Sequence, residues 1–299
     1  MVVTGKGGVG KTTVAAALGL LAARRGKRTV VCEVAEQERL AALFGVGDVG
    51  HEERELAPGL HAVSVQPNRA KEEWLHHQLK SATLAGVLGG SRMFQYLTAA
   101  APGLSELVTI GKVWDLAQLE RRTSGSVFDL AIVDAPSTGH GLAMLRAPGT
   151  YANVARVGPI SRQAGIIDSF LHDSASTGVL VVALPEEMPV SETIDFERRL
   201  ADEVGMQVEQ VVVNAVYPQR FGVEEAERLR SLDGRASPSA RAALRAALAE
   251  HERARGQRSH LRRLRRRVKA PVATLPYVFE PELGRDEVEL LASELERRL

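Results

Sequence analysis

The sequence predicts an α/β protein built on a doubly wound, mostly parallel β-sheet. Short runs rich in Val and Ile recur between stretches with helical spacing, and several runs, such as Val179–Leu184, are apolar throughout. A strand that is apolar on both faces is buried beneath helices on both sides of its sheet. Strands that alternate with helices form parallel sheets through right-handed crossovers.

Seven segments are predicted as strands. They are Val2–Thr4, Arg28–Val34, Leu60–Gln66, Phe128–Asp134, Val179–Leu184, Val208–Val216 and Pro271–Pro276. The first is shorter than an average strand, which has about 5–6 residues. We therefore expect either a short first strand or a native start that lies upstream of Met1.

The amino-acid composition argues against several classes of protein and of binding partner. The 299 residues include 38 Lys and Arg against 37 Asp and Glu, so a net charge of +1 gives no general argument for nucleic acid or membranes. The single cysteine, Cys32, excludes an intrachain disulfide framework and a cysteine-only metal site within one chain. No run approaches the about 20 apolar residues of a transmembrane helix. Because no leader precedes the glycine-rich segment, we expect a cytoplasmic location, with transient contact with a membrane as an extension.

A glycine-rich segment follows the first strand and opens a helix. Residues 5–12, Gly-Lys-Gly-Gly-Val-Gly-Lys-Thr, match the pattern G-x-x-x-x-G-K-[ST] in full. This pattern predicts a phosphate-binding loop for ATP, in which backbone N–H groups and a helix N-terminus surround the phosphates. The expected nucleotide-binding residues are Gly7, Gly8, Val9, Gly10, Lys11, Thr12 and Thr13. Lys11 should reach the β- and γ-phosphates, Thr12 should bind Mg²⁺, and Thr13 should donate to the α-phosphate.

A carboxylate at the end of another strand predicts the second half of this site. Apolar residues lead into Asp134, which is expected to bind Mg²⁺ through a water molecule. The following segment, Ala135–Gly141, contains glycines and hydroxyl side chains and is predicted to sense the γ-phosphate. Its His140 is either a sensor or base, or a solvated loop histidine.

Two connections are too long to be plain loops. They cover residues 67–125 and 144–177, and we expect a single domain, 1–299, in which they form a helical subdomain above the nucleotide site. In the first, apolar residues recur at helical spacing: Trp74, Leu75, Leu79, Met93, Phe94, Leu97, Leu107, Val113, Trp114 and Leu116.

Features beyond the phosphate loop resemble one branch of the deviant Walker-A ATPases. Lys6 stands at the position of their extra lysine, and the runs Asp134–Gly141, Leu184–Thr193, Val211–Asn214 and Leu275–Gly284 are similar to corresponding segments of the branch. The chain thus resembles the bacterial members of the arsenite-pump and tail-anchored-protein-targeting ATPase family. This resemblance implies a dimer that opens and closes across the nucleotide.

The resemblance also implies roles for individual residues. Lys6 should cross the dimer interface and touch the phosphates bound to the partner subunit. Asn214 should hydrogen-bond to adenine, and the backbone of Pro276, Tyr277 and Val278 should close over the ring.

A carboxylate at the end of the second strand implies a further role. In the family, an aspartate at this position activates the attacking water, and Glu33 occupies it here. Its side chain is longer by one C–C bond, about 1.5 Å. Glu33 is therefore either a water-positioning base or a member of a structural ion pair.

The sequence departs from the family in two respects. The paired cysteines that bind zinc or arsenite are absent, and five Met residues in the whole chain are few for a Met-rich client groove. The expected partners are a second copy or a related ATPase, and a client protein or membrane pump. A MinD/ParA-like positioning ATPase remains an alternative, although the acidic ending at 286–299 does not suit an anionic membrane. A metabolic ligase or kinase of the same superfamily is a third interpretation.

One local segment is strongly basic. Residues 253–269 contain nine Arg and Lys and no acid: Arg253, Arg255, Arg258, Arg262, Arg263, Arg265, Arg266, Arg267 and Lys269. The run is either a surface for nucleic acid or anionic lipid, or a solvated helix neutralised by neighbouring glutamates such as Glu224, Glu225, Glu227, Glu250 and Glu252. Because it contains no aromatic residue to stack on bases, nucleic acid is the less favoured partner.

Overall fold

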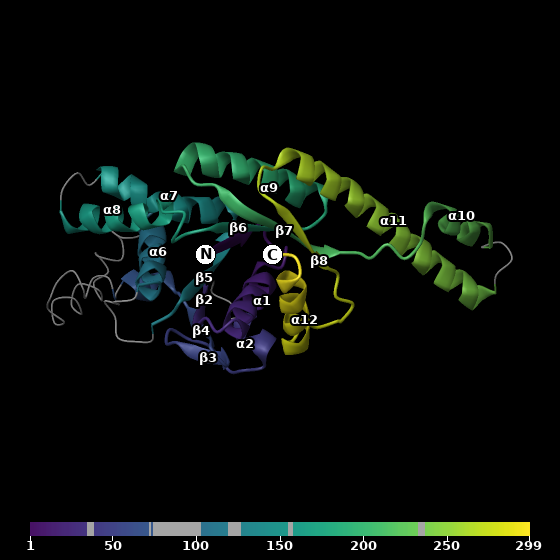
Figure 1. Cartoon of the computed structure of the whole chain (residues 1–299), viewed down its shortest axis with the longest axis horizontal. Coiled ribbons are helices and arrows are strands. Elements are labelled where there is room, and N and C mark those ends of the chain that lie inside the picture. Colours follow the sequence, from purple (N-terminus) through teal and green to yellow (C-terminus); the bar gives the residue numbers. More distant parts are fainter. Residues whose placement is uncertain (35–38, 72, 74–102, 119–126, 155–157, 233–236) are drawn as a thin grey trace.

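The computed structural model describes residues 1–34, 39–71, 73, 103–118, 127–154, 158–232 and 237–299. Its centre is an eight-stranded sheet with the order β3-β4-β2-β5-β1-β6-β7-β8 (Figure 1). The strands are β1 (Val2–Gly5), β2 (Thr29–Glu33), β3 (Arg54–Ala57), β4 (Leu60–Ser64), β5 (Leu130–Ser137), β6 (Val179–Ala183), β7 (Val208–Val216) and β8 (Val272–Pro276). Every adjacent pair is parallel except β3 with β4.

The sheet contains all seven predicted strands and one that the sequence did not predict. The additional strand, β3, forms an antiparallel hairpin with β4 at the edge of the sheet. Its first two residues, Arg54 and Glu55, are exposed, and only the next two are buried. Pattern reasoning missed β3 because a short edge strand with charged residues has no continuous apolar run.

Helices cover both faces of the sheet and confirm the doubly wound class. On one face, α1 (Lys11–Arg24), α2 (Arg39–Phe44) and α12 (Arg285–Glu296) share a buried apolar cluster with the strands. On the other face, a second cluster unites the strands with α6 (Leu104–Leu116), α7 (Thr138–Val154), α8 (Pro159–His172) and α9 (Glu187–Arg199). A π-helical turn, Leu200–Val204, continues α9.

The two long connections contribute helices that pack on the sheet. In the first, α6 buries Leu107, Val113, Trp114 and Leu116, as their spacing predicts. The other apolar residues that suggested helices there, Trp74, Leu75, Leu79, Met93, Phe94 and Leu97, lie outside the described residues. The second helical segment begins earlier than predicted, since Met144 lies within α7, which starts at Thr138. The predicted subdomain above the nucleotide site stays a prediction.

A helical arm extends from the far side of the molecule. It consists of α10 (Val223–Leu232) and the first half of the 30-residue helix α11 (Pro238–Arg267), as Figure 1 shows. The hydroxyl of Ser237 accepts a hydrogen bond from the backbone N–H of Ala240 and caps α11, with Pro238 in its first turn. The second half of α11 returns to the body, where Leu264 is buried in the core. Within the described ranges, no helix combines the length and apolar character needed to span a bilayer.

Candidate functional site

The glycine-rich segment forms a loop between β1 and α1. Gly8 and Gly10 have φ values of +82° and +88°, a region that residues with a Cβ rarely adopt. The helix α1 begins at Lys11, and no side chain caps its N-terminus. Its first N–H groups are therefore available to an anion at the positive end of the helix.

Asn214, at the end of β7, supports this loop directly. Its Nδ2 donates to the backbone oxygen of Val9 at 3.1 Å, and its Oδ1 accepts from the N–H of Ala215 at 2.9 Å. Ala215 has a φ of 56°, the only positive value among the described residues other than glycine. Strained backbone of this kind persists where the surrounding structure fixes it. The contact of Asn214 with adenine stays a prediction.

Lys11 and Thr12 lie at the start of α1, beside the end of β5. Nζ of Lys11 donates to the backbone oxygen of Lys6 at 3.2 Å. Burial lowers the pKa of Lys11, whereas the negative charge of Asp134 opposes this shift. The hydroxyl of Thr12 donates to Oδ2 of Asp134 at 2.5 Å. The structure thus brings together the residues predicted for phosphate and for metal.

Asp134 has an oxygen that is free for a ligand. The side chain is 6% exposed, and its Oδ1 is buried without a hydrogen-bond partner among the described residues. Burial raises the pKa of Asp134, and the Thr12 hydrogen bond and the charge of Lys11 oppose the shift. A hydroxyl beside an unpaired carboxylate oxygen fits Mg²⁺, which prefers oxygen ligands and retains water.

Glu33 has a structural role in this conformation. It ends β2 beside Asp134 in the sheet and is 1% exposed. Its Oε1 accepts from the N–H of Arg39 at 2.8 Å, and its Oε2 from that of Leu40 at 3.4 Å. Glu33 therefore holds the start of α2. Its role as a water-activating base stays a prediction, and the rest of that predicted switch, residues 35–38, lies outside the described residues.

Arg39 is a site residue that sequence reasoning missed. Burial lowers the pKa of Lys11 and raises that of Asp134, and the positive charge of Arg39 adds to the first shift and opposes the second, which places Arg39 in the field of the phosphate loop. The only indication in the sequence was a basic residue soon after β2. A cation there adds to the attraction for phosphate.

Lys6 lies at the exposed rim of the loop. It forms an ion pair with Glu192 on α9, and both side chains are about one third exposed, at 32% and 34%. Glu192 belongs to the run Leu184–Thr193 but was not singled out in it. Lys6 is therefore held within its own chain here, and its reach across a dimer interface stays a prediction.

The predicted γ-phosphate sensor has no separate loop. Strand β5 continues to Ser137 and α7 begins at Thr138, so Ala135–Gly141 is a direct strand-to-helix junction. Gly139 and Gly141 therefore lie in the first turn of α7, and the role of the segment as a γ-phosphate sensor stays a prediction. His140 is exposed on the first turn of α7.

The residues predicted to cover adenine diverge after β8. Pro276 ends the strand, and the ring of Tyr277 stacks on that of Tyr217 with centroids 4.3 Å apart. Tyr277 lines a pocket of about 520 Å³ together with Ala215 and residues of α11. Val278 instead packs against the core cluster on the α1 face. The structure thus places Tyr277 beside this pocket, while Asn214 turns toward the loop.

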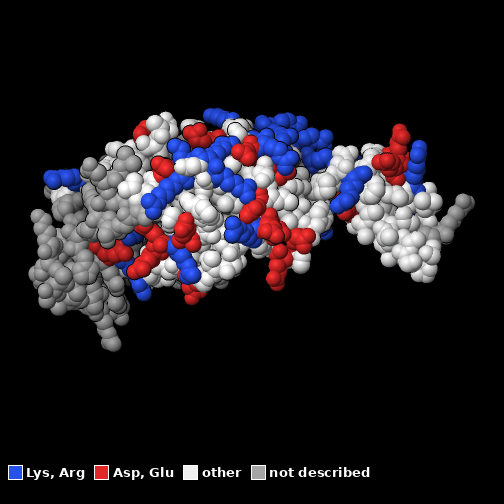
Figure 2. Space-filling view, turned by 60° about the horizontal axis from the view of Figure 1, so that its bottom comes forward, with Lys and Arg blue, Asp and Glu red and all other residues white. Residues whose placement is uncertain are grey.

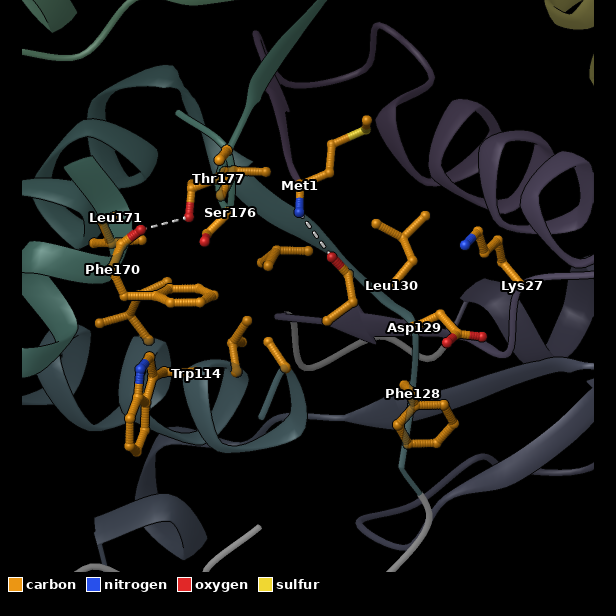
Figure 3. Close-up of a pocket in the computed structure, with 17 residues that line it drawn as sticks. Met1, Lys27, Trp114, Phe128, Asp129, Leu130, Phe170, Leu171, Ser176 and Thr177 are labelled. Carbon is orange, nitrogen blue, oxygen red and sulfur yellow. Dashed lines mark hydrogen bonds between the residues drawn. The ribbon is translucent and has the colours of Figure 1, made fainter. Parts of the chain in front are cut away.

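A second pocket, of about 360 Å³, lies at the opposite end of the sheet. Figure 3 shows that Trp114 and Phe170 line one side and Phe128 and Lys27 the other. None of the residues predicted to bind nucleotide lines it. The phosphate loop and this pocket are therefore separate features.

The geometry of the loop predicts the effect of adding a single methyl group. A Cβ on Gly10 would lie 2.4 Å from Nδ2 of Asn214, whereas a Cβ on Gly8 would meet nothing within 4 Å. Both positions share the strained φ, which costs about 1–2 kcal/mol for alanine. Gly10→Ala should therefore weaken ATP binding at least about tenfold more than Gly8→Ala, as measured by calorimetry. Equal affinities in the two variants would show that the Asn214 contact does not position the loop.

Comparison with known proteins agrees with this geometry. Residues 1–164, which include the loop and Asp134, match the family model described as anion-transporting ATPase. The chain is 29% identical over 221 residues to the ATPase BagA of Mycobacterium tuberculosis, covering 72% of this chain and 64% of that protein. It is 25% identical over 241 residues to the arsenical pump-driving ATPase of Acidiphilium multivorum, covering 72% and 39%. The chain thus spans less than two thirds of each relative, and it belongs to the anion-transporting ATPase family.

Proposed function

We propose that this chain binds ATP with Mg²⁺, hydrolyses it, and uses the nucleotide to open and close a dimer. The observation that carries the proposal is the group formed by Lys11, Thr12 and Asp134 at the uncapped start of α1. These side chains offer a cation, a hydroxyl and an unpaired carboxylate oxygen within one glycine-lined loop. That combination suits a phosphate chain with its bound metal.

Different residues of the site would hold the phosphates and the metal. The N–H groups of α1 and the amine of Lys11 would hold the phosphates, and Thr12 and Asp134 would hold the metal. Mg²⁺ supplies positive charge against the negative charge on the phosphates. Burial disfavours the charged forms of both Lys11 and Asp134, and a bound phosphate and metal would favour those forms.

Dimer closure is consistent with the position of Lys6. An ion pair between partly exposed side chains contributes only about 0–1 kcal/mol. The pair of Lys6 with Glu192 can therefore give way when another anion approaches. The phosphates of a partner subunit, either a second copy or a related ATPase, would provide such an anion.

The junction after Asp134 supports coupling to a client protein or a membrane pump. Because no loop separates β5 from α7, a shift at Ser137 would be transmitted into α7. Residues of α7 and α8, including Leu145 and Ile167, lie in the same core cluster. Closely packed helices move together, so the surface that they present would change with the nucleotide.

The last helix gives no support to the positioning-ATPase alternative. The helix α12 buries Val288, Leu291, Ala292 and Leu295 in the cluster that α1 shares, and leaves the single apolar residue Leu290 exposed, at 48%. Its apolar face is therefore occupied and is not available to a membrane.

Two measurements test the proposed function. Phosphate release from ATP should require Mg²⁺ and stop when the metal is chelated. The reason is that the oxygens of Asp134 and Thr12 would act on the phosphates only through a bound metal ion. The mass in solution should shift from monomer toward dimer with a non-hydrolysable ATP analogue and return with ADP. Phosphate release at the same rate without metal would contradict the proposal. A mass in solution that is the same with the ATP analogue and with ADP would also contradict it.

A further inference from the structure

Four exposed positions lie on one side of the second half of α11, and all four are arginines. They are Arg255, Arg262, Arg265 and Arg266. With 3.6 residues per turn and a rise of 1.5 Å, these side chains fall within an arc of about 100° along about 17 Å of helix. Figure 2 shows a dense group of Lys and Arg side chains over this part of the molecule. We call these four residues the arginine face.

Two of the glutamates expected to neutralise this run pair with arginines elsewhere. Glu250 binds Arg220 at 2.6 Å, and Glu252 forms an ion pair with Arg230, so both serve arginines outside the run. In the described part of the chain, no residue of the arginine face has a hydrogen bond or ion pair. The interpretation as a neutralised helix is therefore not supported for these residues.

Two acids on the neighbouring helix α9, Glu197 and Asp195, are also engaged. Both oxygens of Glu197 accept from the N–H of Lys269 at 3.0 Å, and one also accepts from Ala270. Asp195 pairs with Arg198 on its own helix. The positive charge of the arginine face is thus left uncompensated.

Other arginines of the run fasten α11 to the body of the protein. Arg253 donates to the hydroxyl of Tyr217 at 2.8 Å, and Arg263 donates to that of Ser191 at 3.1 Å. Leu264, nearly opposite the arginine face around the helix, is fully buried. The arginine face is therefore a one-sided surface on a helix that is fixed in the core.

We propose that the arginine face docks on the anionic phospholipid headgroups of a membrane. Guanidinium groups bind phosphate oxygens through several N–H donors at once. A one-sided array on a packed helix suits a plane of phosphates, whereas a helix that enters a nucleic-acid groove needs more of its circumference free. The four positions carry no apolar side chain, so binding is electrostatic and reversed by salt. Docking places the protein beside a membrane partner and goes beyond the proposed ATP cycle.

The test is sedimentation of the full chain with vesicles. We expect binding to phosphatidylcholine vesicles that contain phosphatidylglycerol, and little binding to phosphatidylcholine alone. Each arginine near an anionic surface strengthens binding about fivefold. Changing all four residues of the arginine face to Gln should therefore lower the partition coefficient by about a hundredfold or more, with circular dichroism confirming the fold.

A matched control removes the same charge from other helices. It changes to Gln four arginines that are each paired with an acid, of which only Arg199 is half-buried: Arg198, Arg199, Arg285 and Arg297. This variant should bind anionic vesicles within about threefold of the unmodified chain, because its arginines are already compensated. An equal loss of vesicle binding in both variants would show that binding depends on the net charge of the protein and not on the arginine face, and would overturn the proposal. Failure of the unmodified chain to bind anionic vesicles, or binding to duplex DNA in preference to them, would also overturn it.

Discussion

Replacing Lys11 with alanine should abolish ATP hydrolysis and sharply weaken ATP binding. Lys11 carries the positive charge at the start of α1, where it now donates to the backbone oxygen of Lys6. Removing one donor that stabilises the charge developing in the transition state lowers kcat by about 10²–10³-fold. The variant also deprives Asp134 of an opposing charge, which should raise the pKa of this carboxyl further. Phosphate release and calorimetric binding of ATP would measure both effects.

The control for this experiment is Lys27→Ala. Lys27 is exposed and lines the pocket at the opposite end of the sheet, away from the phosphate loop. Its removal should leave hydrolysis within about twofold of the unmodified chain, since surface substitutions of this kind have small effects. Retention of substantial hydrolysis by Lys11→Ala, with its fold intact, would show that the loop does not bind phosphate as proposed.

Lys6→Ala should keep ADP affinity but lose hydrolysis by about a hundredfold or more. In the structure Lys6 contacts Glu192 of its own chain and lies at the rim of the loop, so it adds little to nucleotide binding by one subunit. If it reaches the partner's phosphates, it supplies charge only in the closed dimer, as cations delivered from a partner protein do in related ATPases and GTPases. Steady-state phosphate release, ADP calorimetry and the mass in solution separate these effects.

Glu192→Gln distinguishes the two roles available to Lys6. This variant removes the intrachain ion pair but leaves the lysine in place, so closure and hydrolysis should match or exceed those of the unmodified chain. If Glu192→Gln instead loses as much activity as Lys6→Ala, the intrachain pair itself is required, and the lysine does not cross the interface. Hydrolysis at the unmodified rate by Lys6→Ala would remove the deviant-loop lysine from the mechanism.

The parts of the fold that the sequence predicted are those that depend on burial alone. Val179–Leu184 is apolar throughout because β6 lies between helices, and pattern reasoning recognises such strands directly. The edge strand β3 could not be found this way, because its pairing with β4 holds it in place although Arg54 and Glu55 face solvent. The start of α7 was missed because Gly139 and Gly141 are typical of loops, whereas here they lie in its first turn.

The candidate site likewise contains contacts that the sequence predicts and contacts that it does not predict. The contact between Thr12 and Asp134 follows from the motif, since the motif fixes both the helix start and the strand end that meet there. By contrast, the contacts of Lys6 with Glu192 and of Asn214 with Val9 join residues that are 186 and 205 positions apart. They depend on side-chain direction at the junction of several elements. The same is true of Glu33, whose longer side chain reaches the first N–H groups of α2.

The position of β1 in the sheet has a consequence for synthesis of the chain. The phosphate loop is made before the two strands that flank β1, because β1 is paired with Val133–Ser137 of β5 and Val179–Val182 of β6. Asn214, which donates to the loop, is made later still. Contacts so distant in sequence form slowly and late. A nascent chain therefore completes the supports of the loop only after β5, β6 and β7 have been translated, and ATP would bind once these strands are in place rather than guide the folding of β1.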